Sequence, residues 1–380
     1  MKKVLATILA LVMALSVTTM AWADDVAKIG DTGYATLQEA VNAATAGQTI
    51  VLQDNVTLTA SLIVAGDKTV TLDLNSYKIT AAMNGPHMIC NAGNLTITDS
   101  SENKTGEIAK IGAETNFGYV IENHGTMTLD RCKISSTSVK SSAIENGWYT
   151  ASANTAGTSC TMTIQNAEVV SVNAAGGLYT VKNDDYGVMV INGGVFTNGV
   201  AGAGAVLNWN DLTINGGTFT GASAVRTLKS GSSDFETGKS QIKNGTFNGG
   251  IDTLDGYKTG ITIAVTGGTF STDVKEYLAE GKILQKNGDT YTAVTNSGIT
   301  SGTYTAKPTV PDGYKVVENT DGTFTVEKVG GYYYYQPTTD TKTTDTKGSP
   351  KTFDAGIALY VGMALTSAAG VAFVGKKRED

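Results

Sequence analysis

The sequence has few of the residues from which metal centres and nucleic-acid-binding surfaces are built. It contains only two histidines among 380 residues, too few for a metal centre ligated by several imidazoles. Its formal net charge is −7, and an acidic surface repels nucleic acid and anionic lipid. We therefore expect no metal, no cofactor and no nucleic-acid partner.

Cysteine is equally scarce. Cys90, Cys132 and Cys160 are the only three, and their spacings of 42 and 28 residues match no zinc-binding signature. An odd number excludes a complete set of intramolecular disulfides. Two readings stay open: three small, partly buried thiols, or one disulfide and one free thiol.

Proline and charged residues are few, whereas glycine is abundant. Five prolines and 17% charged residues accompany 45 glycines. This composition is typical of turn-rich β proteins and not of helical ones. The expected fold class is all-β.

The N-terminal residues have the layout of a secretory signal peptide. Two lysines precede an apolar run from Val4 to about Val17, which is too short to span a bilayer comfortably. The small residues Ala21 and Ala23 then occupy the positions that a signal peptidase reads. We expect a mature, exported chain that begins at Asp24.

The C-terminal residues have the layout of a membrane span with a basic stop. An uncharged stretch of 21 residues, Ala355 to Gly375, precedes Lys376-Lys377-Arg378. As a helix it would be about 30 Å long, the thickness of a hydrocarbon core. The basic tail favours the cytoplasmic side, so the rest of the chain would lie outside. This segment is the one expected contact with a membrane.

The order of motif, apolar span and basic tail resembles the sorting signal of Gram-positive sortase substrates. SPKTFD (residues 349–354) resembles their L-P-x-T-G motif: Pro350 and Thr352 match, whereas Ser349 and Phe353 replace leucine and glycine, and Lys351 is the variable residue. The resemblance implies that a sortase attacks the Thr352 carbonyl and transfers the chain to peptidoglycan. A plain membrane anchor is the alternative.

An internal repeat dominates the middle of the chain. A recurring motif begins with an apolar-polar-apolar stretch such as Met127-Thr128-Leu129-Asp130 and ends at an apolar residue seven positions after its first residue, here Ile134. Glycines often occur between the two, where the chain would bend. These end positions, 134, 169, 196, 219, 247 and 270, are 35, 27, 23, 28 and 23 residues apart. The shortest spacing, 23 residues, indicates the length of one solenoid turn, and the longer spacings indicate turns with loop insertions. The alternation of apolar and polar residues within each motif is typical of strands.

A second phrase, apolar-x-Asn, precedes the first in each turn. Asparagine tolerates turn geometry, and its amide can bond to the equivalent amide one turn along. Stacked copies would form a hydrogen-bonded ladder inside the solenoid. The predicted ladder residues are Asn91, Asn123, Asn146, Asn183 and Asn208.

The start of the solenoid carries a capping signal. Thr36 and Glu39 form a T-x-x-E capping box before an apolar helix face that would cover the first turn. The segment Tyr34 to Leu52 (YATLQEAVNAATAGQTIVL) resembles the cap and first strand of the pectate-lyase-like β-helix superfamily. With the following turns, the resemblance implies a right-handed parallel β-helix.

These observations divide the chain into five parts. A short helix at Asp273 to Leu278 would close the last turn, and strands on either side of Asn319 to Gly322 would form a separate hairpin. The parts are a signal peptide (1–23), a parallel β-helix (24–295), a small β-hairpin region (296–330), a flexible stalk (331–348) and the sorting signal (349–380).

The superfamily resemblance also implies possible chemistry. Its lyases use Ca²⁺ held by aspartates with an arginine or lysine base, and its hydrolases use two or three aspartates. The nearest match is Lys182 beside Asp184 and Asp185, with Arg226 about two turns further on. Adjacent aspartates in a strand point to opposite faces, which argues against a catalytic pair.

We therefore expect a non-catalytic, adhesin-like surface protein that presents a strand face to a polysaccharide or host ligand. The alternative is a wall-attached polysaccharide lyase or glycoside hydrolase. The aromatic side chains expected to stack on sugar rings are Trp148, Tyr149, Tyr179, Tyr186 and Trp209.

Overall fold

The computed structural model describes residues 25–81, 83, 85, 87–112, 117–137, 140–148, 157–172, 178–229 and 237–330. The segments expected to form a signal peptide, a stalk and a sorting signal, with Ala21, Ala23 and Ser349 to Thr352, lie outside these residues. Within the described ranges, no helix is long and apolar enough to cross a membrane. The chain separates into one unit that ends at Val329 and a second that begins at Gly330. All strands described below belong to the first unit.

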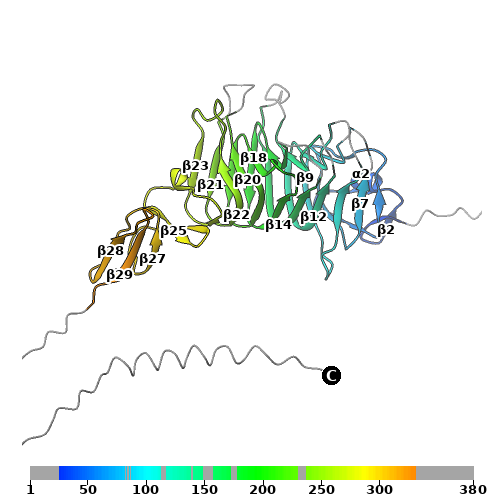
Figure 1. Cartoon of the computed structure of the whole chain (residues 1–380). Coiled ribbons are helices and arrows are strands. Elements are labelled where there is room, and N and C mark those ends of the chain that lie inside the picture. Colours follow the sequence, from blue (N-terminus) through cyan, green and yellow to red (C-terminus); the bar gives the residue numbers. More distant parts are fainter. Residues whose placement is uncertain are drawn as a thin grey trace, which may run out of the picture. The chain divides into compact units, whose positions relative to one another are not determined.

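The first unit is all-β and consists mainly of a long solenoid of parallel strands (Figure 1). Each turn places one strand in each of three columns, so that residues far apart in sequence become neighbours. This arrangement confirms the predicted all-β, β-helix-like solenoid.

The ladder column contains the apolar-x-Asn strands. Its members pair in parallel from one turn to the next, with Ile121 opposite Ile144 and Val181 opposite Val206. The strands are β5 (Leu62–Val64), β8 (Ile89–Asn91), β11 (Ile121–Asn123), β13 (Ile144–Asn146), β15 (Tyr179–Asn183), β18 (Gly204–Asn208) and the second halves of β20 (Thr218–Thr227) and β22 (Thr246–Asp252).

The second column follows the asparagine turn, and the third follows the glycine bend. Second-column strands are β3 (Gln48–Leu52), β6 (Thr69–Asp73), β9 (Asn94–Thr98), the first halves of β12 (Thr126–Ser136) and β14 (Cys160–Ser171), β16 (Gly187–Ile191), β19 (Asp211–Ile214), β21 (Lys239–Ile242) and β23 (Thr262–Val265). Third-column strands are β4 (Val56–Thr57), β7 (Lys78–Ala81), β10 (Glu107–Lys110), the second halves of β12 and β14, β17 (Gly194–Asn198), the first halves of β20 and β22, and β24 (Thr269–Phe270).

The glycine bends are needed for backbone geometry. Gly194 has φ +111°, and a Cβ there would lie 2.3 Å from the carbonyl oxygen of Ala167 one turn away. Only glycine combines this dihedral angle with such a close approach between turns.

One continuous apolar core fills the solenoid. Its largest repeated feature is a stack of four buried rings, Phe196, Phe219, Phe247 and Phe270, with neighbouring centroids 4.9, 5.0 and 4.9 Å apart. The same period that sets the sequence spacing therefore places like side chains directly above one another.

The predicted asparagine ladder is present. Each Nδ2 donates to the Oδ1 of the next asparagine, at 2.7, 2.7, 2.8 and 2.8 Å from Asn91 through Asn208, and all five side chains are buried. Each also donates to a backbone carbonyl, so the amides satisfy turn groups that the parallel strands leave without partners.

The N-terminal end of the solenoid is covered as the capping signal predicts. Helix α2 (Leu37–Ala43) has Thr36 as its N-cap, and both hydrogen bonds of the capping box with Glu39 are formed. Strands β1 (Ala27–Ile29) and β2 (Thr32–Tyr34) pair antiparallel to each other, and β1 pairs antiparallel to β3.

The other end of the solenoid changes from parallel to antiparallel pairing. Parallel pairing stops at β24, because β26 (Thr290–Thr295) pairs with it antiparallel. Strands β25 (Lys282–Asn287), β27 (Gly302–Tyr304), β28 (Tyr314–Glu318) and β29 (Phe324–Lys328) extend an antiparallel sheet around a small core of their own. The hairpin β28–β29 is thus paired into this sheet, and the helix expected at 273–278 is a single 3₁₀ turn, Lys275–Tyr277.

Candidate functional site

The outward-facing middle residues of the ladder strands form a polar row. Parallel register places Cys90, Glu122, Glu145, Lys182, Leu207, Arg226 and Asp252 one above another. We call this row the polar column. It is unusual for an outer strand face because acidic and basic side chains within it are largely buried.

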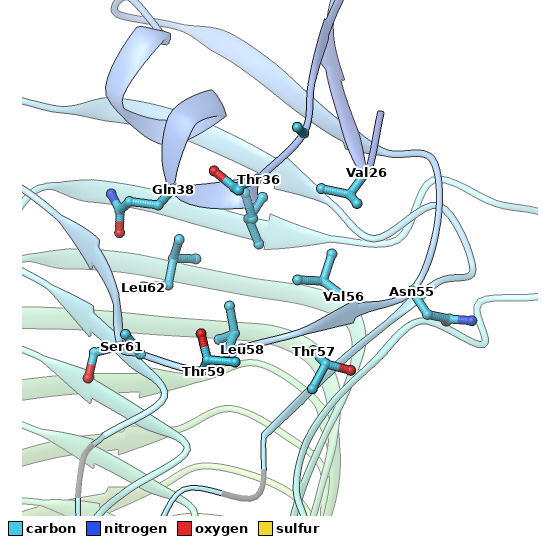
Figure 2. A pocket seen from close by; sticks show the side chains of 13 residues that line it. Val26, Thr36, Gln38, Asn55, Val56, Thr57, Leu58, Thr59, Ser61 and Leu62 are labelled. Carbon is cyan, nitrogen blue, oxygen red and sulfur yellow. The ribbon is translucent and has the colours of Figure 1, made fainter. Parts of the chain in front are cut away.

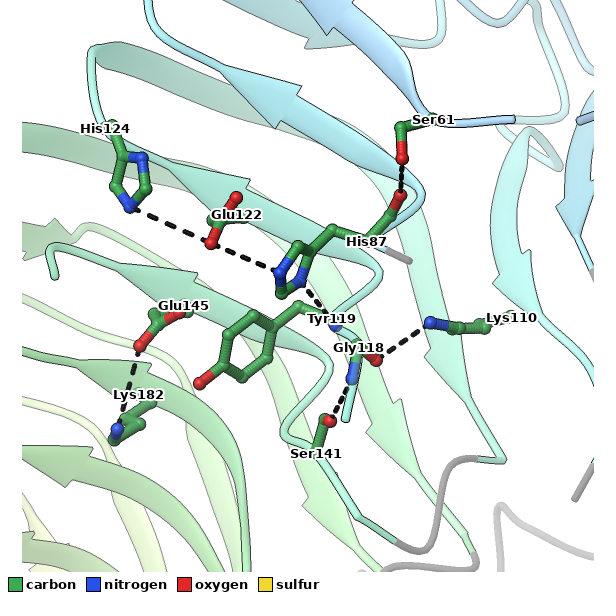
Figure 3. Close-up of polar contacts among 10 residues, drawn as sticks. All are labelled: Ser61, His87, Lys110, Gly118, Tyr119, Glu122, His124, Ser141, Glu145 and Lys182. Carbon is green, nitrogen blue, oxygen red and sulfur yellow. Dashed lines mark hydrogen bonds and ion pairs between the residues drawn. The ribbon is translucent and has the colours of Figure 1, made fainter. Parts of the chain in front are cut away.

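Both histidines of the chain meet at Glu122 (Figure 3). The Nε2 atoms of His87 and His124 lie 3.3 and 3.9 Å from Glu122 Oε1. The three side chains are about one-fifth to one-quarter exposed, so ligands in solution can reach them. Burial is the main reason that the pKa of Glu122 is raised and that of His124 is lowered.

Aromatic rings frame this group. The imidazole of His124 stacks on the indole of Trp148 with centroids 3.7 Å apart and planes 2° apart. His87 stacks on Tyr119 at 5.1 Å, and Phe117 meets Tyr119 edge-on at 4.9 Å. The rings hold both imidazoles in fixed orientations.

A second, more deeply buried group lies next along the column. Lys182 forms ion pairs with Asp184 and with Glu145, whose Oε1 is 3.7 Å from the lysine Nζ. Burial raises the pKa of Glu145 to about 9 although the Lys182 ammonium opposes the rise, and the nearby Asp184 carboxylate adds to it. The pKa of Tyr119 is also raised, chiefly by burial and then by Glu145.

The structure brings together three of the four catalytic candidates and separates the fourth. Asp184 and Asp185 follow β15 in a turn and are both buried, so the expectation that they alternate across a strand is wrong. Asp184 contacts Lys182, whereas Arg226 lies two turns away. Arg226 donates from Nε and Nη2 to the two carboxylate oxygens of Asp252, at 2.5 and 2.9 Å, which is a bidentate structural ion pair.

The aromatic candidates are less available than expected. Tyr179 is only 5% exposed and lies under the Arg226 guanidinium, 5.8 Å from its ring centroid, so it is not a sugar platform. Trp209 meets Tyr257 edge-on at 6.2 Å, and Trp148 gives one ring face to His124. Tyr186 is partly exposed with φ +61°, and Tyr149 lies outside the described residues.

None of the sequence patterns singled out the residues at the centre of the site. Glu122 and Glu145 occupy the middle of two Ile-Glu-Asn phrases, and a register alignment of those phrases would have placed them beside Lys182. His87 and Tyr119 precede their strands in irregular segments, and no sequence period predicts their approach.

The cysteines form no disulfide: all three lie in described residues and each is a thiol. Burial raises the pKa of Cys90 to about 11 and that of Cys132 to about 12, and nearby carboxylates add to both shifts. Neither supplies a thiolate nucleophile near neutral pH.

A separate cavity of about 360 Å³ lies between α2 and the first solenoid turn (Figure 2). Apolar side chains such as Leu37 and Val56 and the hydroxyls of Thr57 and Ser61 line it, with no titratable side chain among its lining residues. It offers space but no acid, base or ion.

In the described part of the chain, no three His, Cys, Asp or Glu side chains are arranged to hold a metal ion.

Comparison with known proteins found no matching family model, no matching curated protein and no matching solved structure.

Proposed function

We propose that this chain is a secreted bacterial surface protein whose polar column binds a glycan, or a host ligand, without catalysing its breakdown. In this proposal the solenoid is a right-handed parallel β-helix, the hand that parallel crossover connections adopt almost without exception. A sortase joins the C-terminus to peptidoglycan, or the apolar span alone holds it in the membrane.

The observation that carries the binding proposal is the group around Glu122. Two imidazoles, a carboxylate and a fixed indole reach the surface from successive turns, and all are held by rings or hydrogen bonds. A few convergent polar groups beside aromatic surface, prepositioned by a rigid scaffold, are typical of small-molecule and sugar sites.

Binding is favoured over catalysis because the strongest acid-base candidate is out of reach. Glu145 is 1% exposed, Asp184 beside it is buried, and Asp185 is buried as well. A general acid or base must lie within hydrogen-bond distance of the reacting group, directly or through one water. As arranged, these carboxyls stabilise the column and do not touch a polymer on its surface.

One observation favours the alternative, a polysaccharide lyase or glycoside hydrolase. Glu145, with a pKa raised to about 9, lies beside the Asp184–Lys182 ion pair, and strongly shifted carboxyls often mark active sites. Side chains packed around Glu145 would have to move to expose it.

A glycan array and a lyase assay on the mature, full-length chain test both possibilities together. We expect retention of at least one glycan class and no release of unsaturated uronides from pectin or alginate, with or without Ca²⁺. Absorbance near 235 nm that grows with time and is abolished by Asp184→Ala or Glu145→Gln would establish the enzyme instead. No binding to any glycan would remove the proposed function.

Attachment is tested by Thr352→Ala in the producing bacterium. If sortase processes the chain, the unmodified protein resists boiling in detergent and is released by muramidase, because it is covalently bound to the wall. The variant should move to the membrane fraction and keep residues 355–375, which are long enough to span. Lys351→Ala, a change at the variable position of the motif, is the matched control and should stay in the wall. If detergent extracts all of the unmodified protein, attachment by sortase is excluded and the membrane span alone holds the chain at the surface.

A further inference from the structure

The two acceptor atoms that Glu122 and His124 present to the surface have a specific spacing. His87 Nδ1 accepts the Tyr119 backbone N–H at 3.0 Å, so its proton is on Nε2, which lies 3.3 Å from Glu122 Oε1. A hydrogen bond with the backbone of Gly147 works against the lowering of the His124 pKa, as an imidazole N–H that donates to a carbonyl does. We assign that N–H to Nδ1 of His124, which leaves Nε2 as an acceptor. That nitrogen and Glu122 Oε1 are 3.9 Å apart, too far for a hydrogen bond between them.

Two facing acceptors at this distance fit a donor that carries more than one hydrogen. A nitrogen placed ~2.9 Å from each would bridge them with ordinary hydrogen bonds. A hydroxyl has a single hydrogen and satisfies one acceptor, whereas an ammonium group satisfies both and still has a third hydrogen.

The surrounding charges favour a cation at this point. On the strands that pack against His124, Glu122 belongs to β11, and Asp184 and Asp185 follow β15, whereas Cys90 on β8 is a thiol and burial raises the pKa of Glu145 on β13 to about 9. The opposing cations are already engaged: Lys182 with Asp184 and Glu145, and Lys110 with the carbonyl of Gly118 at 2.9 Å. The exposed ring of Phe117 and the partly exposed indole of Trp148 add surface that attracts an ammonium group.

We propose that Glu122 and His124 bind the amino group of an amino sugar, with His87 positioning the Glu122 carboxylate. The inference rests on the proposed glycan-binding function and names the ligand class of that site. The resemblance to pectate-lyase-like proteins implies a polymer of uronic acids as ligand. A uronate carboxylate placed in this site would be repelled by the Glu122 carboxylate, whereas an ammonium group would be attracted.

The binding depends on pH in a defined direction. An ammonium ligand requires ionised Glu122 and neutral His124, and both forms gain population as the pH rises. Because burial raises the pKa of Glu122, some of the unbound molecules carry a protonated Glu122, and these lose that proton when the ligand binds. Affinity should therefore increase from about pH 5 to about pH 7, and calorimetry in buffers of different ionisation enthalpy should show proton release.

A matched pair of ligands isolates the amino group. The β-1,4-linked glucosamine pentasaccharide and its N-acetylated counterpart differ only in the amine, and are titrated into the full-length chain in detergent by calorimetry. We expect the amine form to bind at least about tenfold more tightly at pH 7, since hydrogen bonds to charged groups contribute about 1.5–3 kcal/mol. Because the chain has two histidines, imidazole NMR reports the site directly, and both sets of resonances should shift.

Glu122→Gln should abolish the preference for the amine form, because the amide cannot become anionic. Glu107→Gln is the matched control, since Glu107 is a similarly buried carboxyl that pairs with Lys78 in the third column, and it should keep the preference. Far-ultraviolet circular dichroism and thermal unfolding midpoints of the free variants verify folding.

The outcomes separate the two levels of the proposal. Equal binding of both pentasaccharides, preference for a uronate, or an amine preference that survives Glu122→Gln overturns the amino-sugar site and leaves glycan binding standing. Absence of binding to every glycan overturns both.

Discussion

Replacing Phe219 by alanine is expected to lower the free energy of unfolding by about 3–5 kcal/mol, the usual cost of deleting a buried ring. Phe219 is fully buried and stacks on Phe196 at 4.9 Å and on Phe247 at 5.0 Å. Its removal therefore leaves two ring faces without a partner and opens a cavity that the parallel strands on either side hold open.

Urea unfolding followed by circular dichroism measures this loss. Tyr257→Ala is the matched control, because it also deletes a ring but at a side chain that is 42% exposed, and it should change the stability by less than about 1 kcal/mol. A loss below about 1 kcal/mol for Phe219→Ala would contradict the continuous aromatic stack.

Replacing Asn146 by leucine is expected to destabilise the fold by about 1–3 kcal/mol. Asn146 accepts from Asn123 at 2.7 Å and donates to Asn183 Oδ1 at 2.8 Å and to the Val188 carbonyl at 3.3 Å. Leucine removes these bonds from the middle of a buried ladder, so the neighbouring amides and a backbone carbonyl lose partners without gaining water.

The chain contains a surface counterpart that serves as a control. Asn215 donates to Asn192 at 2.7 Å in an exposed ladder that continues to Gln165. Asn215→Leu breaks the same kind of bond where water can replace it, so thermal unfolding should shift much less than for Asn146→Leu. Equal shifts for the two variants would show that burial does not set the cost.

The solenoid was predictable because its information is local and periodic. The Ile-Glu-Asn phrases and the apolar-polar alternation recur at spacings that only stacked turns satisfy, and the structure pairs Ile121 with Ile144 as those phrases predict. The capping box at Thr36 is a contact within one turn of helix, so four residues of sequence suffice to recognise it.

The end of the solenoid was not predictable in the same way. The segment 282–295 contains apolar residues that suit a strand, but this composition does not specify whether pairing is parallel or antiparallel. Its partner β24 determines that choice, and the result is an antiparallel sheet that includes the predicted hairpin.

The sequence also located only the edge of the candidate site. Lys182, Asp184 and Asp185 were recognised as adjacent charged residues, but the expectation that the aspartates point apart assumed a strand where the chain turns. Glu122, Glu145 and the two histidines carried no signal as a set, because they are spread over three turns, with only Glu122 and His124 on the same one.

By itself, the sequence determined the all-β repeat, its period, the asparagine ladder and the helical cap, since each follows from the conformational preferences of neighbouring residues. Only the tertiary structure decided that His87 and His124, 37 positions apart, meet one carboxyl on Glu122, and that Glu145 is buried beside Lys182. The register between turns sets these contacts, and with them the desolvation that shifts the pKa values. Register depends on packing summed over the whole solenoid, which no single segment of the sequence contains.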